Sequence, residues 1–204
     1  MTQHSPLFQS VFGEAWEHLP PVMRKHYDVR PGSNDMVVVE GALDVERSRL
    51  ARLLSPVLRL YGALMPYSGK QVPVTVRFTS PPGTRHFVFD RVLRFPGHSP
   101  YRFHSHMEHR KNDEMVEFMR FGIGWRSRYA WDGQRVRLHH AGYVWRIFGL
   151  FIPLPLELLL GRSDAWEEPL SDDSFRMEMA VVHPWFGKTY SYGGTFRVTE
   201  VCHG

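Results

Sequence analysis

VPVTVRFTSPPGTRHFVFDRVLRF, residues 72–95, contains two runs in which apolar and polar residues alternate. The turn sequence Ser80-Pro-Pro-Gly83 separates the two runs. Because side chains on a strand point alternately to its two faces, this pattern predicts two antiparallel strands that share one buried face.

The same alternation continues toward the C-terminus. Further runs occur near 101–109, 115–121, 125–131, 136–140, 175–181 and 189–198, and 36–45 adds a β-branched segment. Helical spacing of apolar residues appears at about 6–27, interrupted by Pro20-Pro21, and at about 47–64. We therefore expect an α+β fold, with two N-terminal helices and a strongly curved antiparallel meander of about seven to nine strands, half-barrel or lipocalin-like. No linker or repeat divides the chain, so 1–204 is expected to be a single domain.

The composition excludes several classes of protein. Hydrophobic residues make up 43% and charged residues 23%, which is globular and not disordered. The formal net charge is +4, but Lys and Arg are spread without a basic block, so no nucleic-acid partner is expected. Cys202 is the only cysteine, which excludes a disulfide scaffold or a cysteine-rich zinc site. The first residues do not resemble a secretory signal, so we expect a cytoplasmic location.

The most apolar stretch is YVWRIFGLFIPLPLELLL at 143–160. Charged residues and prolines keep its uninterrupted apolar runs well below the roughly 20 residues of a transmembrane helix, so no integral membrane segment is predicted. The pattern indicates a crossing segment followed by a short helix after Pro155. A lid over a cavity, a dimer contact and a shallow membrane-docking patch all remain possible roles for it.

Two charged residues fall in phase with apolar ones. Arg91 shares a strand face with Phe89, and Glu117 shares one with Met119. If these faces point inward, the two charges should pair or contact a ligand, because an isolated buried charge is too costly. Three interpretations stay open: an ion pair that fixes strand register, faces that point outward, and a ligand-binding or catalytic role.

Aromatic residues are 14% of the chain, and nine methionines accompany them. Such side chains fill a thick β core or line a cavity that holds one small ligand. We expect the following residues to bind that ligand: Phe89, Ser105, Met107, Met119 and Tyr129.

A weak metal candidate is His104, His106 and Glu108, which share one strand face. Arg102 and Arg110 lie on the same face, which favours a solvated polar surface, so we expect neither metal nor other cofactor. No Gly-x-Gly-x-x-Gly or Gly-x-Ser-x-Gly motif is present.

Several phrases resemble a bacterial domain-of-unknown-function family that is sometimes fused behind saccharopine-dehydrogenase-like reductases. They are LPPVMRKHY (19–27), MPYSGKQVPVTVRF (65–78), FDRVLRF (89–95), IPLPLELLLG (152–161) and HPWFGKTYSYGGTF (183–196). The resemblance implies a metabolic setting with lipid-like or other apolar substrates. It assigns no catalytic residue.

Three functions follow as hypotheses. The first is a binding domain for an apolar or amphipathic small molecule. The second is a cofactor-independent isomerase, cyclase or hydrolase in which Glu117 transfers a proton and Arg91 stabilises developing negative charge. The third is an interaction domain, either a homodimer or a module that docks a reductase partner through 143–160.

Overall fold

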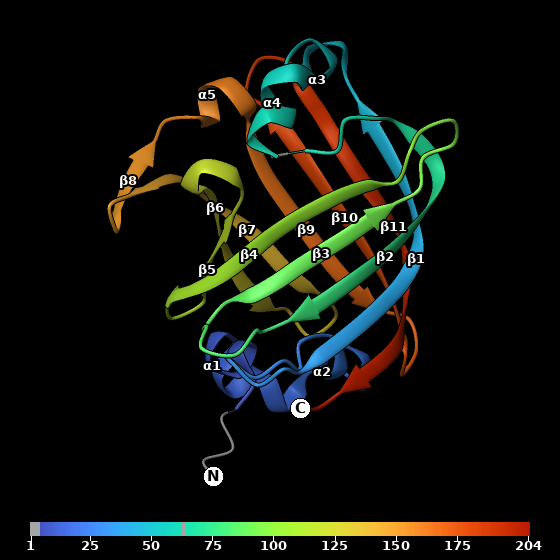
Figure 1. The fold of residues 1–204 in the computed structure, drawn as a ribbon, viewed down its shortest axis with the longest axis vertical. Coiled ribbons are helices and arrows are strands. Elements are labelled where there is room, and N and C mark those ends of the chain that lie inside the picture. Colours follow the sequence, from blue (N-terminus) through green and yellow to red (C-terminus); the bar gives the residue numbers. More distant parts are fainter. Residues whose placement is uncertain (1–4, 63) are drawn as a thin grey trace.

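The alternating runs form the wall of a closed antiparallel β-barrel (Figure 1). The computed structural model describes residues 5–62 and 64–204. Its strands are β1 (Met36–Arg47), β2 (Gly69–Thr79), β3 (Phe87–Leu93), β4 (Tyr101–Lys111), β5 (Glu114–Phe118), β6 (Ile123–Trp131), β7 (Val136–Ile147), β8 (Leu150–Leu154), β9 (Arg162–Pro169), β10 (Ser174–His183) and β11 (Gly187–Cys202). All of them except β8 take part in the barrel, which therefore has ten strands.

The barrel closes where β1 pairs with both β2 and β11. Gly194 is needed at this seam, because a Cβ there would lie 1.9 Å from the carbonyl oxygen of Ala42 on β1. Of the two forms expected for the antiparallel meander, half-barrel and lipocalin-like, the structure has the closed one. The α+β class and the seven to nine strands are corrected: the fold is mostly β, and the barrel has ten strands. Alternation along each strand indicates which face is buried, but it does not indicate that the first and last strands pair.

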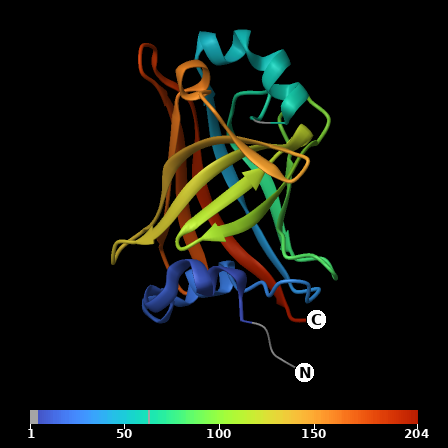
Figure 2. The same cartoon turned by 90° about the vertical axis from the view of Figure 1, so that its left-hand side faces the viewer.

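A helical segment near the N-terminus closes the lower end of the barrel in Figures 1 and 2. It comprises α1 (Leu7–Phe12), the 3-10 helix η1 (Gly13–His18) and α2 (Pro21–His26), which begins at the Pro20-Pro21 interruption. The Phe8 ring packs 4.4 Å from Tyr27, 5.0 Å from Phe87 and 5.3 Å from Tyr129, measured between ring centroids. These aromatic contacts make the segment a plug that fills the lower part of the interior.

The second predicted helix is two short ones, α3 (Arg49–Leu53) and α4 (Ser55–Tyr61), at the opposite, upper end. The 3-10 helix η2 (Arg120–Gly122) connects β5 and β6, and α5 (Glu157–Leu160) precedes β9. None of the helices among the described residues is long and apolar enough to span a bilayer.

The apolar stretch at 143–160 is not a simple crossing segment. Its first part completes β7 and turns at Phe148–Gly149, where both residues have positive φ, into β8. The β7–β8 hairpin projects from the barrel wall (Figure 1), and Phe151 packs on its outer side against Val116, Phe118 and Val144. The short helix expected after Pro155 is α5.

Candidate functional site

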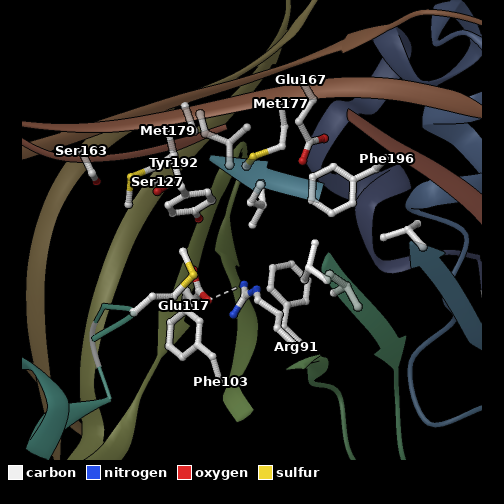
Figure 3. A pocket seen from close by; sticks show the side chains of 18 of the residues that line it. Arg91, Phe103, Glu117, Ser127, Ser163, Glu167, Met177, Met179, Tyr192 and Phe196 are labelled. Carbon is white, nitrogen blue, oxygen red and sulfur yellow. Dashed lines mark hydrogen bonds and ion pairs between the residues drawn. The ribbon is translucent and has the colours of Figure 1, made fainter. Parts of the chain in front are cut away.

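The barrel encloses a cavity of about 130 Å³ between the lower plug and the upper helices. Its wall is mostly apolar, and Figure 3 shows how the side chains converge on it. The aromatic and methionine residues of the wall are Tyr27, Met65, Phe78, Phe89, Phe103, Trp125, Tyr129, Phe175, Met177, Met179, Tyr190, Tyr192 and Phe196. Burial raises the pKa of the Tyr192 hydroxyl to about 12, so this hydroxyl stays protonated at neutral pH.

Arg91 and Glu117 meet at one side of the cavity (Figure 3). Arg91 Nη2 donates to Glu117 Oε1 at 2.9 Å, and Arg91 Nη1 donates to Ser105 Oγ at 3.0 Å. The Ser105 hydroxyl in turn donates to the same Glu117 oxygen at 2.5 Å. Glu117 Oε2 has no hydrogen-bond partner among the described residues, so it is the acceptor that remains for a ligand.

Strand register explains this meeting. Arg91 on β3 is opposite Phe103 on β4, whereas Glu117 on β5 is opposite Met107. Ser105 lies midway between these two positions on the same face of β4, so the long arginine side chain reaches the carboxylate past it. The guanidinium also stacks on Phe89 and Phe103, with Cζ 4.5 and 4.7 Å from the ring centroids.

A second polar centre lies at the lower side of the cavity and was missed by sequence reasoning. Tyr27 Oη donates to Glu167 Oε2 at 2.5 Å, and His26 Nε2 lies 3.6 Å from Glu167 Oε1. Burial, followed by the charge of Glu167, raises the pKa of the Tyr27 hydroxyl well above its ordinary value. His26 Nδ1 is buried without a partner among the described residues. An orphaned polar atom of this kind beside a cavity is a natural contact for a ligand or a water molecule.

The residues expected to bind a ligand do not all reach the cavity. Phe89 and Tyr129 line it, and Ser105 is one hydrogen bond away through Arg91 and Glu117. Met107 and Met119 are buried in the surrounding core and are not part of the cavity wall. Tyr129 Oη lies 3.8 Å from Met107 Sδ, so Met107 supports the wall from behind.

The three candidate metal residues lie on the outer face of the barrel, and only two of them come together. His106 and Glu108 come together with His86, which precedes β3, and their ligand atoms lie within 4.8 Å of one another. His104 instead lies 4.0 Å from Asp90. Arg146 is paired with the same Glu108 oxygen that both histidines approach. A guanidinium in that place competes with a metal cation for the carboxylate.

The upper side of the cavity continues toward α3, α4 and α5. A smaller pocket beneath these helices shares Leu64, Trp125 and Tyr190 with the main cavity. Trp125 Nε1 is buried there without a hydrogen-bond partner among the described residues. The shared residues place the smaller pocket next to the main cavity on its upper side.

Comparisons with known proteins give a family and two distant structures. Residues 19–196 match the family described as a domain of unknown function, DUF4166. The structure of Rv2717c from M. tuberculosis is 12% identical over 93% of this chain and 99% of that chain, with a TM-score of 0.41. The dehydratase domain of the polyketide PpsC from Mycobacterium tuberculosis is 8% identical over 92% of this chain and 84% of that chain, with a TM-score of 0.19. No curated protein matches the chain. Because the family match spans most of its length, the protein belongs to the DUF4166 family.

Proposed function

We propose that this protein binds an apolar or amphipathic small molecule inside its barrel. The observation that carries the proposal is the cavity of about 130 Å³, in which aromatic and methionine side chains surround two separate carboxylates, Glu117 and Glu167. Buried carboxylates are costly, and a barrel that only needed a filled core would be more stable with apolar residues at both positions.

The cavity favours a narrow ligand. Its volume of about 130 Å³ is below the roughly 300–1,000 Å³ of sites for drug-sized molecules and near the ~150 Å³ of an apolar cavity that holds benzene. The free oxygen of Glu117 accepts a hydrogen bond, so the polar group of the ligand is expected to be a donor such as a hydroxyl. A ligand carboxylate is less suitable, because Glu117 and Glu167 would repel it.

Native mass spectrometry of the freshly purified protein tests for a ligand that remains bound, and titration with hexanol, followed by NMR, tests the cavity directly. We expect hexanol to shift the resonances of the cavity residues. Ala165→Leu places a larger side chain in the cavity wall and should weaken binding at least tenfold.

The matched control is Ala180→Leu on β10. Ala180 lies between the buried residues Met179 and Val181 and therefore points to the outer face. This variant should bind hexanol as the wild type does. The proposal is wrong if no ligand co-purifies and hexanol leaves the cavity resonances unchanged.

A second candidate function is proton transfer by Glu117 without a cofactor. It is favoured by the arrangement at that residue: Oε1 is held by Arg91 and Ser105, whereas Oε2 is left free for a substrate proton. The Arg91 guanidinium, which donates to Glu117 Oε1, would stabilise negative charge that develops on the substrate.

Isotope exchange separates this candidate from simple binding. A ligand recovered from the protein is returned to it in D₂O, and exchange of carbon-bound hydrogen is followed by mass spectrometry. Exchange that is lost in Glu117→Gln, with ligand affinity retained, supports catalysis. Absence of exchange in the wild type leaves binding as the function and excludes proton transfer from carbon.

A further inference from the structure

The exposed large apolar side chains are concentrated at one part of the molecule. Among the described residues, all of them except Leu170 and Val201 lie on α3, α4, η2, α5, the β7–β8 hairpin or the end of β10 and its turn into β11. Figures 1 and 2 place α3, α4, α5 and this turn at the upper end of the barrel, with the hairpin projecting beside α5. We call the exposed large apolar side chains of α3, α4, η2, α5, the β7–β8 hairpin and the β10–β11 turn region the upper rim. Isolated exposed apolar residues are ordinary, but a concentration of this kind marks an interaction surface.

Two exposed aromatic residues of the upper rim are held in place. Trp185 and Phe186, in the β10–β11 turn, are 72% and 63% exposed. The Trp185 backbone N–H donates to His183 Nδ1 at 3.2 Å, and His183 Nε2 donates to the carbonyl oxygen of Leu158 at 3.0 Å. This chain of hydrogen bonds fixes the turn to α5, whose Leu158 and Leu159 are 61% and 52% exposed. The apolar side chains of the turn and of α5 are therefore held next to each other.

Positive charge accompanies the upper rim. No acidic residue occurs between Glu46 and Asp90, a stretch that contains both α3 and α4. Arg49, Arg52 and Arg59 on these helices are exposed and have no acidic partner within 4.0 Å among the described residues. Arg120 and Arg162 are likewise exposed. Of the acids nearby, Glu46 pairs with Lys188 and Glu157 lies 3.2 Å from His140, so these five arginines outnumber the two acids.

We propose that the upper end of the barrel docks on the surface of an anionic lipid bilayer. Apolar side chains that enter the headgroup region, together with arginines that attract anionic lipids, are the two contributions that hold a protein at a membrane surface. A symmetric dimer through the same surface is disfavoured, because it would bring the arginines of two copies together. The docking is independent of the proposed ligand binding, but it would bring the smaller pocket beneath α3, α4 and α5 close to the lipid.

Flotation with lipid vesicles tests the proposal. The full chain should bind vesicles of phosphatidylcholine mixed with phosphatidylglycerol, bind phosphatidylcholine alone more weakly, and be released by salt. Each of Arg52→Gln and Arg59→Gln should lower the partition coefficient about fivefold, since one basic residue near an anionic surface contributes ~1 kcal/mol. Trp185→Ser combined with Phe186→Ser should lower it at least tenfold.

The matched controls are Leu170→Ser and Arg24→Gln, which change an exposed leucine and an exposed arginine outside the upper rim. They should leave vesicle binding unchanged. The proposal is overturned if the wild type does not bind anionic vesicles at low salt, or if the controls weaken binding as much as the rim variants do. It is also overturned if sedimentation finds a dimer that Trp185→Ser abolishes and vesicle binding is absent.

Discussion

Tyr27 at the end of α2 donates a 2.5 Å hydrogen bond to Glu167 on β9, and this contact joins the lower plug to the barrel wall. Tyr27 is 1% exposed and Glu167 is 9% exposed. Among the described residues the carboxylate has no second hydrogen-bond donor, and the nearest His26 nitrogen is 3.6 Å away. The solvation of a buried carboxylate therefore depends on one hydroxyl, which adds a polar contact to the aromatic packing of the plug.

Tyr27→Phe should destabilise the protein by about 1–3 kcal/mol, because it leaves a buried acceptor without its donor. Urea unfolding followed by circular dichroism measures the change in the free energy of unfolding. Tyr67→Phe is the control, since the Tyr67 hydroxyl makes no hydrogen bond to a described residue and its ring stacks on His98, 3.7 Å between centroids. Equal losses in the two variants would contradict this role of Tyr27.

The buried tyrosines predict a loss of stability in alkali. Burial raises the pKa of Tyr27, Tyr129 and Tyr190 well above the ordinary value and that of Tyr192 to about 12. Above about pH 10 the unfolded chain loses tyrosine protons that the folded chain keeps, so the unfolded state binds fewer protons and stability falls as pH rises. Each such tyrosine contributes a slope of about 1.4 kcal/mol per pH unit, and Tyr27→Phe should reduce the total slope by that amount. Tyrosinate absorbance near pH 10 that accounts for all eight tyrosines of the folded protein would contradict the prediction.

The alternation of apolar and polar side chains was sufficient to predict most strands. It failed for strands whose polar residues do not all lie on one face, or whose two faces are both apolar. β9, RSDAWEEP, was missed because Glu167 occupies an inward position, so its polar residues do not separate cleanly onto one face. The β7–β8 hairpin was missed for the opposite reason. Its outer face packs Phe151 on Phe118, so both faces of the segment are apolar. Barrel closure depends on pairing between β1 and β11, which are distant in sequence.

One of the two polar centres was accessible from the sequence. Arg91 and Glu117 lie within regular alternating runs, so their phase predicted that each shares a face with apolar residues, and the structure turns both faces toward the cavity. The second centre combines Tyr27, at the end of a helix, with Glu167, from the missed strand. Their contact exists only because the plug enters the barrel, and residues 140 positions apart give no local signal of it.

The Arg91–Glu117 pair should show strong coupling in a double-mutant cycle. Arg91 is 15% and Glu117 is 21% exposed, so removal of one partner leaves a poorly solvated charge. Arg91→Met or Glu117→Met alone should cost about 2–3 kcal/mol, somewhat below the loss for a fully buried pair. The double variant should be less destabilised than the sum of the two single variants, because it leaves no unpaired charge.

The outer pair Arg102–Asp90 provides the control for this cycle. Arg102 is 69% exposed, and solvent screens the pair even though its closest N–O distance is 2.6 Å. Its coupling energy should be within about 1 kcal/mol of zero. If the coupling energies of both pairs are equally small, water solvates the Arg91–Glu117 pair, and the cavity holds more water than its apolar wall indicates.

His140 should make the protein less stable in mild acid. Its side chain is buried, with Nδ1 3.2 Å from Ser163 Oγ and Nε2 3.2 Å from Glu157 Oε1. Burial lowers the pKa of the imidazole more than the Glu157 carboxylate raises it. Below about pH 6.5 the unfolded chain therefore binds a proton that the folded chain resists. Stability is complete above that pH and falls as the pH decreases toward the lowered pKa.

The adjacent residue isolates this effect, because His139 is 62% exposed and points to the other side of β7. Urea unfolding between about pH 5 and 7 should show that His140→Gln reduces the acid slope by up to ~1.4 kcal/mol per pH unit, whereas His139→Gln retains it. NMR titration of the imidazole resonances gives an independent measure. The contrary outcome is that His140 titrates in the folded protein near the pKa of an exposed histidine. The folded protein would then accept the proton on His140, with Glu157 on α5 moving to pair with it. The acid slope would then have to arise from other groups.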